Sequence, residues 1–270
     1  MKKFFIIAVI ILPLFFLGIW LVAIPEHLIV ELLEGALNEK GIKLKAEGFK
    51  KGLFCSFGAE KILVSNRRDA PIVTIADLDV RLDWLSLLEL TPRLNLNGRI
   101  NNGRVYGDIG LKGRENPVSI RGDNVHIKGL PFLERSGIIG DGVLALNFQS
   151  INNRGELRFS INDAQFKSIH STDTDYLPLH LFQRVKGVLI VKQATINVQS
   201  LTLEGRGVYI RIKGDIGKNK PNMKVELMMD SSFEWGPFLQ GSLEQYKVSP
   251  GYYILPSSQI VPSLQKWCRF

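Results

Sequence analysis

Cysteine is scarce in this chain of 270 residues, and its shortage excludes two classes of small domain. Cys55 and Cys268 are the only cysteines, which is too few for a disulfide scaffold, and they lack the spacing of a zinc site. They could pair in an oxidising compartment. The distance between their Cα atoms decides this, so the sequence leaves the pairing open.

Motifs of common catalytic sites are also missing. The chain has no G-x-S-x-G elbow, no G-x-x-x-x-G-K-[ST] phosphate loop and no H-E-x-x-H helix. A G-x-G at 205–207 lies within strand-like sequence, whereas a dinucleotide site needs a turn from a strand into a helix. The run from His170 to Asp175 is typical of a surface loop and specifies no metal geometry. We therefore predict no catalytic residue, no metal site, no cofactor and no enzymatic activity.

Acidic residues are outnumbered, 26 against 34 lysines and arginines, which gives a formal net charge of +8. A basic balance suggests nucleic acid, but the positive side chains are scattered, as at Arg99, Arg104, Lys112 and Arg114. This pattern favours solvated strand faces, with attraction to anionic lipid headgroups as the alternative. We expect no nucleic-acid partner.

One long uncharged run is present, from Phe4 to Ile24. About 20 apolar residues in a helix span the hydrocarbon core of a bilayer. Lys2 and Lys3 precede the run, so residues 1–3 are predicted to stay in the cytoplasm. The alternative is a cleaved signal peptide, whose apolar region is usually shorter and ends in a small-x-small site. We expect an uncleaved anchor over 4–24 and, in a bacterium, a single-pass inner-membrane protein with its bulk in the periplasm.

The exported part has the pattern of one helix followed by many strands. Residues 25–40 fit a helix leaving the membrane, with Pro25 at its first position and Gly41 after its end. Apolar and polar residues then alternate, which places apolar side chains on one face of a sheet. Alternation recurs in 42–46, 94–97, 125–128, 143–148, 157–161, 188–191, 196–203, 208–212 and 223–228. Turn residues separate these runs at 101–103, 152–155 and 217–221.

We therefore predict a mainly β protein without a linker after the anchor, so that 41–270 forms one periplasmic β domain. The fold class is an N-terminal transmembrane helix followed by an elongated, curved antiparallel β-sheet. The sequence leaves open whether the sheet forms a groove or a sandwich. One or two short helical interruptions are expected, near Trp84 to Leu88 and near Leu179 to Val185.

Two groups of residues are candidates for special roles in the sheet: three glycines at turns or bulges, and seven apolar residues that could line a groove. Gly205, Gly207 and Gly214 are candidates for turns or bulges, where a side chain would disturb the sheet. The candidate apolar groove face consists of Val143, Leu157, Phe159, Ile161, Ile196, Val198 and Leu201. If these residues pack on another sheet, the chain is a sandwich and a scaffold. If they line an open trough, the apolar surface needs a ligand.

The segment 77–88 and the following Leu94-Asn95-Leu96-Asn97-Gly98 resemble a recurrent strand, helical turn and strand of AsmA-like envelope proteins. More specifically, residues 1–256 are similar to the family of the type II secretion system protein N, also called general secretory pathway protein N. The best-matching segments are 186–191, 201–208, 213–216 and 251–256. The match rests on glycine spacing and architecture.

This resemblance implies an inner-membrane-anchored periplasmic accessory subunit of the machine that exports folded proteins across the outer membrane. Its partners would be other secretion-system envelope subunits and the inner membrane. The alternative function is lipid binding or transfer in the cell envelope. AsmA-like sheets are similar to lipid-transfer grooves, in which a curved sheet shields lipid acyl chains. We expect the secretion subunit, with the lipid-binding protein as the alternative.

Overall fold

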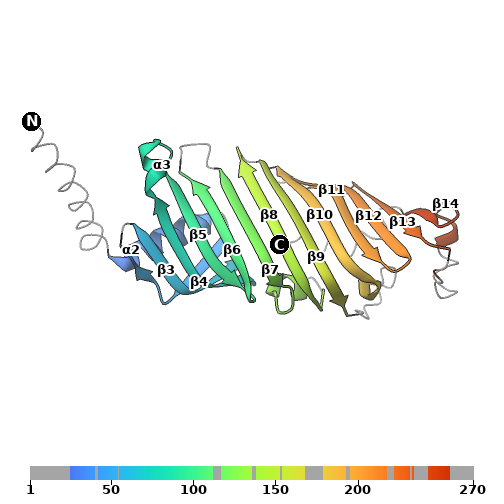
Figure 1. Ribbon diagram of the computed structural model, residues 1–270, viewed down its shortest axis with the longest axis horizontal. Coiled ribbons are helices and arrows are strands. Elements are labelled where there is room, and N and C mark those ends of the chain that lie inside the picture. The colour runs from blue at the N-terminus through green and yellow to red at the C-terminus, as the bar shows by residue number, and fades with distance from the viewer. Residues whose placement is uncertain are drawn as a thin grey trace, which may run out of the picture. The chain divides into compact units, whose positions relative to one another are not determined.

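The computed structural model describes residues 25–39, 42–53, 55–111, 117–135, 138–152, 154–167, 179–192, 195–217, 222–231, 233 and 243–255. The prediction of a mainly β chain with short helices is confirmed (Figure 1). The described strands form one 15-stranded antiparallel open sheet. The predicted anchor at 4–24 and Cys268 lie outside the described residues.

The strand order follows the chain almost without exception. It runs β1-β3-β4-β5-β6-β7-β8-β9-β10-β11-β12-β13-β15-β14, and β2 pairs with β3 beside this path. Short connections between consecutive strands produce this order, because a strand that turns back at once lies antiparallel to the strand it has just left. In the β5–β6 turn, Asn101 and Asn102 both have positive φ, as a two-residue hairpin turn requires.

The contacts divide the chain into two compact units, a division that the sequence does not reveal. Unit 1 comprises 1–100 and 104–113, and unit 2 comprises 101–103 and 114–270. A meandering sheet makes most of its contacts between adjacent strands. Its contacts can therefore fall into two groups although no linker-like sequence lies between them.

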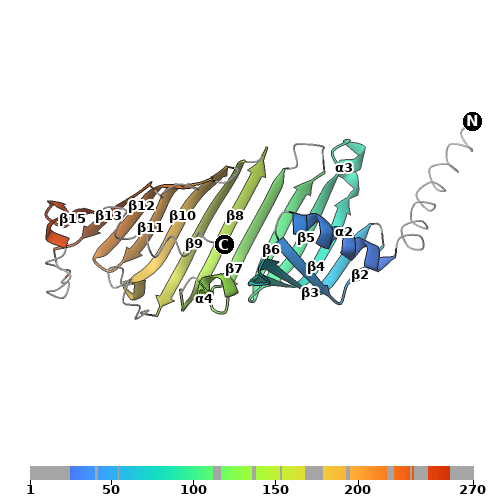
Figure 2. The same cartoon turned by 180° about the vertical axis from the view of Figure 1, so that it is seen from behind.

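Unit 1 combines a helix with the first strands. It contains α2 (Glu26–Glu39), β1 (Ile42–Glu47), β2 (Lys50–Lys51), β3 (Ser56–Asn66), β4 (Pro71–Asp83), α3 (Trp84–Leu88), β5 (Arg93–Ile100) and all but the first residue of β6 (Gly103–Gly110). Figure 2 shows α2 lying over one face of these strands. Among the described residues of this unit, the buried apolar side chains are Ala59, Ile62 and Val80. The predicted helix at 25–40 therefore matches α2 over the described residues.

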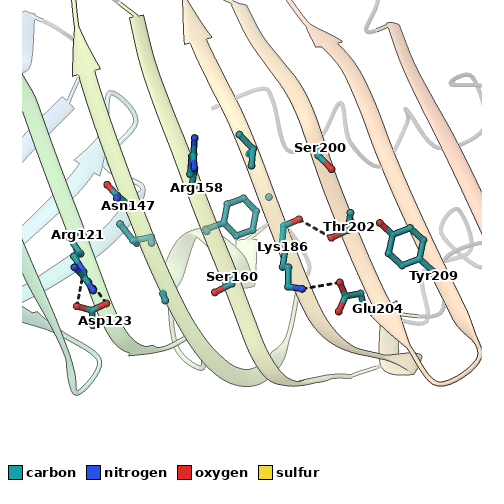
Figure 3. A pocket seen from close by; sticks show the side chains of 15 residues that line it. Arg121, Asp123, Asn147, Arg158, Ser160, Lys186, Ser200, Thr202, Glu204 and Tyr209 are labelled. Atoms are coloured by element: carbon teal, nitrogen blue, oxygen red, sulfur yellow. Dashed lines mark hydrogen bonds and ion pairs between the residues drawn. The ribbon is translucent and has the colours of Figure 1, made fainter.

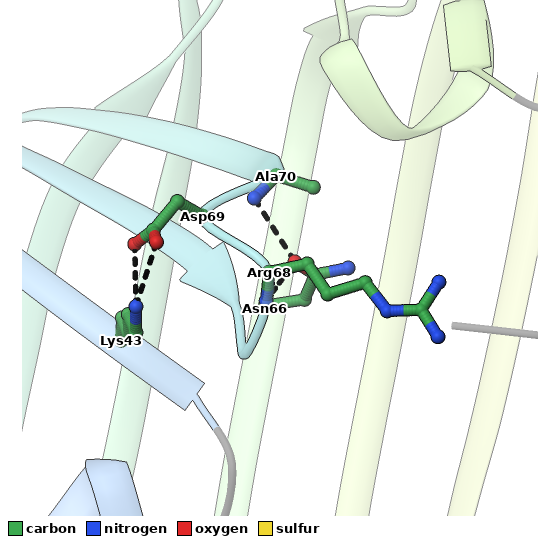
Figure 4. Close-up of polar contacts among 5 residues, drawn as sticks. All are labelled: Lys43, Asn66, Arg68, Asp69 and Ala70. Atoms are coloured by element: carbon green, nitrogen blue, oxygen red, sulfur yellow. Dashed lines mark hydrogen bonds and ion pairs between the residues drawn. The ribbon is translucent and has the colours of Figure 1, made fainter.

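The β3–β4 turn of unit 1 is held by side chains (Figure 4). The Asn66 side-chain oxygen accepts the backbone N–H groups of Arg68 and Ala70, each at 2.9 Å. Lys43 reaches across from β1, and its Nζ lies 2.7 Å from both carboxylate oxygens of Asp69. Asp69 has positive φ, which aspartate tolerates better than most residues. The turn thus joins β1 to the β3–β4 hairpin.

Unit 2 contains most of the long strands. Its elements are β7 (Val118–His126), α4 (Pro131–Arg135), β8 (Gly140–Ile151), β9 (Arg154–Phe166), the 3₁₀ turn η2 (Leu179–Leu181), β10 (Phe182–Lys192), β11 (Thr195–Gly205), β12 (Val208–Ile216), β13 (Asn222–Met229), β14 (Lys247–Ser249) and β15 (Tyr252–Leu255). Phe182, Ile210 and Val225 are its most deeply buried large side chains.

The two short helices expected from the sequence have different outcomes. Trp84–Leu88 is helical, as predicted. The second is wrong over most of its length, because only Leu179–Leu181 forms a 3₁₀ turn and β10 begins at Phe182. Phe182 and Val185 are buried in the sheet, and this pairing overrides any local helical preference.

Candidate functional site: the two faces of the unit 2 sheet

Six of the seven predicted groove residues lie on one face of the unit 2 sheet. Residues paired across antiparallel strands point to the same face. Phe159 pairs with Gly187, which pairs with Leu201, and Leu157 pairs with Leu189, which pairs with Val198. Ile161 and Ile196 follow by the two-residue period. We call this surface the apolar face, defined by Leu157, Phe159, Ile161, Ile196, Val198 and Leu201.

Val143 is placed on the opposite face and does not belong to this group. It pairs with Asn162, whereas the next residue, Leu144, pairs with Ile161. The sequence 143–146 is Val-Leu-Ala-Leu, so apolar residues occupy consecutive positions and give no information on the face. An irregularity between Asp141 and Val143 then sets the register.

Burial varies across the apolar face. Ile161 and Val198 are buried, while Leu157, Phe159, Ile196 and Leu201 are half-buried. The Phe159 ring lies against the backbone of Gly187, where a Cβ atom would collide with the ring. An aromatic ring thus covers a strand glycine that has no side chain of its own. The role of this face as a ligand groove stays a prediction.

The three glycines chosen from the sequence lie around β11 and β12. Gly205 ends β11, and Gly207 lies in the turn before β12 with φ 71°. Gly214, within β12, has φ 141°, and a Cβ atom there would collide with the carbonyl oxygen of Asn222. Only glycine reaches this backbone conformation without strain beside a neighbouring strand. Gly214 pairs with Val198, next to the register shift between Val198 and Leu201.

The opposite surface of the sheet is polar and contains a hollow of about 740 Å³ (Figure 3). We call it the polar face. Polar side chains from strands β7 to β12 line the hollow: Arg121, Asp123, Asn147, Arg158, Ser160, Lys186, Ser200, Thr202, Glu204 and Tyr209. They alternate along the strands with residues of the apolar face, as in Ser160 between Phe159 and Ile161. Each strand therefore serves both surfaces.

Ion pairs organise the charges of the polar face. Arg121 Nε lies 3.1 Å from Asp123 Oδ2, and Arg158 Nε lies 2.5 Å from Glu156 Oε1. Glu204 accepts hydrogen bonds from Lys186 Nζ at 3.1 Å and from Arg184 Nη1 at 3.2 Å. Partial burial alone would raise the pKa of Glu204, but the bonds from the two cations outweigh it and lower this pKa below its ordinary value. Glu204 is thus held ionised between strands β10 and β11.

Among the residues that line the hollow, Phe159 was singled out from the sequence and none of the polar side chains was. The available signal was the polar half of each alternating run, such as Arg158 and Ser160 or Thr202 and Glu204. This signal is weak because solvated strand faces are polar in any antiparallel sheet. The strand register is what brings Lys186 and Glu204 together, although 18 positions separate them in the chain.

Neither a helix that could span a membrane nor a cluster of metal ligands is found among the described residues. None of the helices in this part of the chain is long and apolar enough to cross a membrane. Within the same residues, no group of three or more His, Cys, Asp or Glu side chains is arranged to hold a metal ion. Cys55 is a half-buried free thiol, and burial raises its pKa.

No protein-family model, curated protein or solved structure matches the chain.

Proposed function

We propose that the chain is an accessory subunit of the type II secretion pathway, anchored in the inner membrane by residues 4–24, with its sheet in the periplasm. The observation that carries this proposal is the position of the segments on which the resemblance rests. Residues 186–191, 201–208 and 213–216 belong to the adjacent strands β10, β11 and β12, and 252–255 form β15 of the same sheet. These best-matching segments therefore lie close together in the sheet of unit 2, with β13 between β12 and β15.

In this function the sheet binds other envelope subunits and needs no catalytic residue or cofactor. The polar face supplies the binding chemistry, because its hollow offers both cations and carboxylates together with the hydroxyl groups of Ser160, Thr202 and Tyr209. A partner subunit with complementary charges would align with these strands. Exposed ion pairs contribute little to stability, so they can exchange partners at small cost.

The test is the secreted-protein profile of a strain that lacks the protein, measured together with outer-membrane lipid composition and permeability. Accumulation of exported enzymes in the periplasm, with an intact lipid barrier, is the expected result. Normal export combined with a leaking barrier or mislocalised phospholipid would overturn the secretion function and leave the lipid function described next.

A second candidate function, lipid binding or transfer, is favoured by the apolar face. Six apolar side chains share one side of a single open sheet, and four of them are only half-buried. Soluble proteins seldom leave a broad apolar surface to water. In this proposal the sheet is elongated and curved into a groove, and lipid acyl chains lie along Leu157, Phe159 and Leu201.

Neighbouring residues on opposite faces allow a matched test of lipid binding. A photoreactive amino acid at position 157 samples the apolar face, and the same amino acid at position 158 samples the polar face. Irradiation in cells followed by mass spectrometry should yield lipid adducts at 157 and none at 158. Equal adduct yields at both positions, or none at 157, would contradict lipid binding by this face.

A further inference from the structure

Exposed apolar side chains gather at one end of unit 1. Trp84 is 48% exposed, Leu85 72% and Leu90 83%, all in α3 or the turn after it. Leu53, in the loop before β3, is 57% exposed, and Leu111 after β6 is also exposed. We call these five residues the apolar rim. Figure 1 shows α3 at the tip of β4, beyond the end of the strand.

The strand register places the members of the rim at the same end. Ser56 pairs with Arg81 near the end of β4, and the Leu53 carbonyl accepts hydrogen bonds from the backbone and side chain of Ser56. On the other side of β4, the Leu111 N–H donates to the Pro92 carbonyl at 2.8 Å. Leu53, α3 and Leu111 therefore follow one another across adjacent strands.

Helix α2 begins at this end as well. The Glu26 carboxylate accepts the backbone N–H of Lys51 at 3.0 Å, and Lys51 pairs with Phe57. Phe57 in turn pairs with Val80, four residues before Trp84. The uncharged run 4–24 ends one residue before Pro25, where the described chain starts. An anchor formed by this run would leave the bilayer directly at the end of unit 1 that carries the rim.

We propose that the apolar rim inserts into the interface of the same bilayer that residues 4–24 cross, so that unit 1 contacts the lipid surface at two places. Tryptophan and leucine suit this location, because amphipathic indole rings concentrate at the headgroup level and leucine enters the acyl boundary. Only Pro25 separates the run from α2, and this short connection keeps the rim close to the membrane. This inference rests on the anchor in the proposed function.

The test measures the contact of Trp84 with lipid in the full chain. Trp20, Trp235 and Trp267 are replaced by phenylalanine, so that Trp84 alone emits. The protein is reconstituted in vesicles of phosphatidylethanolamine with a minority of phosphatidylglycerol, with or without lipids brominated near the glycerol end of their acyl chains. Brominated lipid should quench Trp84 emission more than twofold, and Leu85→Ser with Leu90→Ser should reverse most of this quenching.

The opposite end of unit 1 supplies the matched control. Arg68 is an exposed residue of the β3–β4 turn (Figure 4), and β4 has 13 residues between this turn and α3. At about 3.3 Å per residue the two ends are about 40 Å apart. A variant with Trp84→Phe and Arg68→Trp should therefore not be quenched.

Each outcome has a defined meaning. Vesicles that float with bound protein, but without quenching of Trp84, would show that the anchor holds and that the rim does not touch lipid, which overturns the inference. Equal quenching of Trp84 and of the Arg68→Trp variant would also overturn the inference. Protein that does not float with the vesicles would contradict both the anchor and the contact of the rim with lipid. Secretion by the deletion strain is scored separately.

Discussion

The two faces of the unit 2 sheet are made from the same strands, yet different forces stabilise them. The strand register places Leu203, Ile210 and Val225 on the same side as the apolar face. All three are buried, so burial of apolar surface stabilises this side of the sheet. On the polar face, Lys186, Arg158 and Arg121 are solvated and bound in exposed ion pairs. The apolar face therefore contributes most of the stability of the sheet, whereas the exposed ion pairs of the polar face contribute little.

The sharpest test of this comparison uses two adjacent residues of β11. Leu203 is buried on the apolar face, and Thr202 is half-buried on the polar face. Leu203→Ala should lower the free energy of unfolding by about 3 kcal/mol, because it removes buried methyl groups and leaves a cavity. Thr202→Ala should cost less than about 1 kcal/mol, since its hydroxyl makes only a 3.5 Å contact with the Lys186 carbonyl. Urea unfolding of the full chain in detergent micelles measures both, and equal losses would refute the division of roles.

A change in the backbone should disturb both faces together. Gly214→Ala forces a side chain into a left-handed conformation against the Asn222 carbonyl, with an expected cost of about 2 kcal/mol. Gly217→Ala is the control, because a Cβ atom there meets only Thr195 at 3.4 Å, an ordinary contact. Thermal unfolding of the two variants compares them. A midpoint for Gly214→Ala that equals the control would show that the β12–β13 ladder yields without strain.

The smallest effect is expected from the ion pairs of the polar face. The pKa of folded Glu204 lies below the ordinary value of 4.5, so its bonds to Lys186 and Arg184 add stability above that value. This stability is lost as the pH falls through the folded pKa. Glu204→Gln should therefore lose a little stability at neutral pH and show a shallower decline in acid than the original chain.

Chemical unfolding at a series of pH values from neutral to acid measures this difference. Glu89→Gln, which removes an exposed carboxyl group from the turn after α3, is the control and should keep the slope of the original chain. An unchanged slope in Glu204→Gln would mean that the cations of β10 do not hold this carboxylate in solution.

Much of the local structure follows from the sequence. The alternation in 157–161 and 196–203 predicts two strands, and these segments lie in β9 and β11, respectively. Asn101-Asn102-Gly103 predicts the β5–β6 turn correctly, because these residues tolerate positive φ. The pattern fails at Phe182 to Val185, where buried strand pairing overrides the expected helix. It also fails at Val143, where consecutive apolar residues leave the face undefined.

The sequence is enough to predict that the chain is mainly β, where most strands lie, and which residues alternate between two faces, because a period of two is a local property of the backbone. It does not predict which strands are neighbours or in what register, and these follow from the folded structure. The folded structure thereby brings Lys186 to Glu204, sets Phe159 over Gly187, and places Leu53 at the same end of unit 1 as Trp84. These relations depend on pairing between distant residues, and bulges such as that between Val198 and Leu201 shift the pairing by single residues.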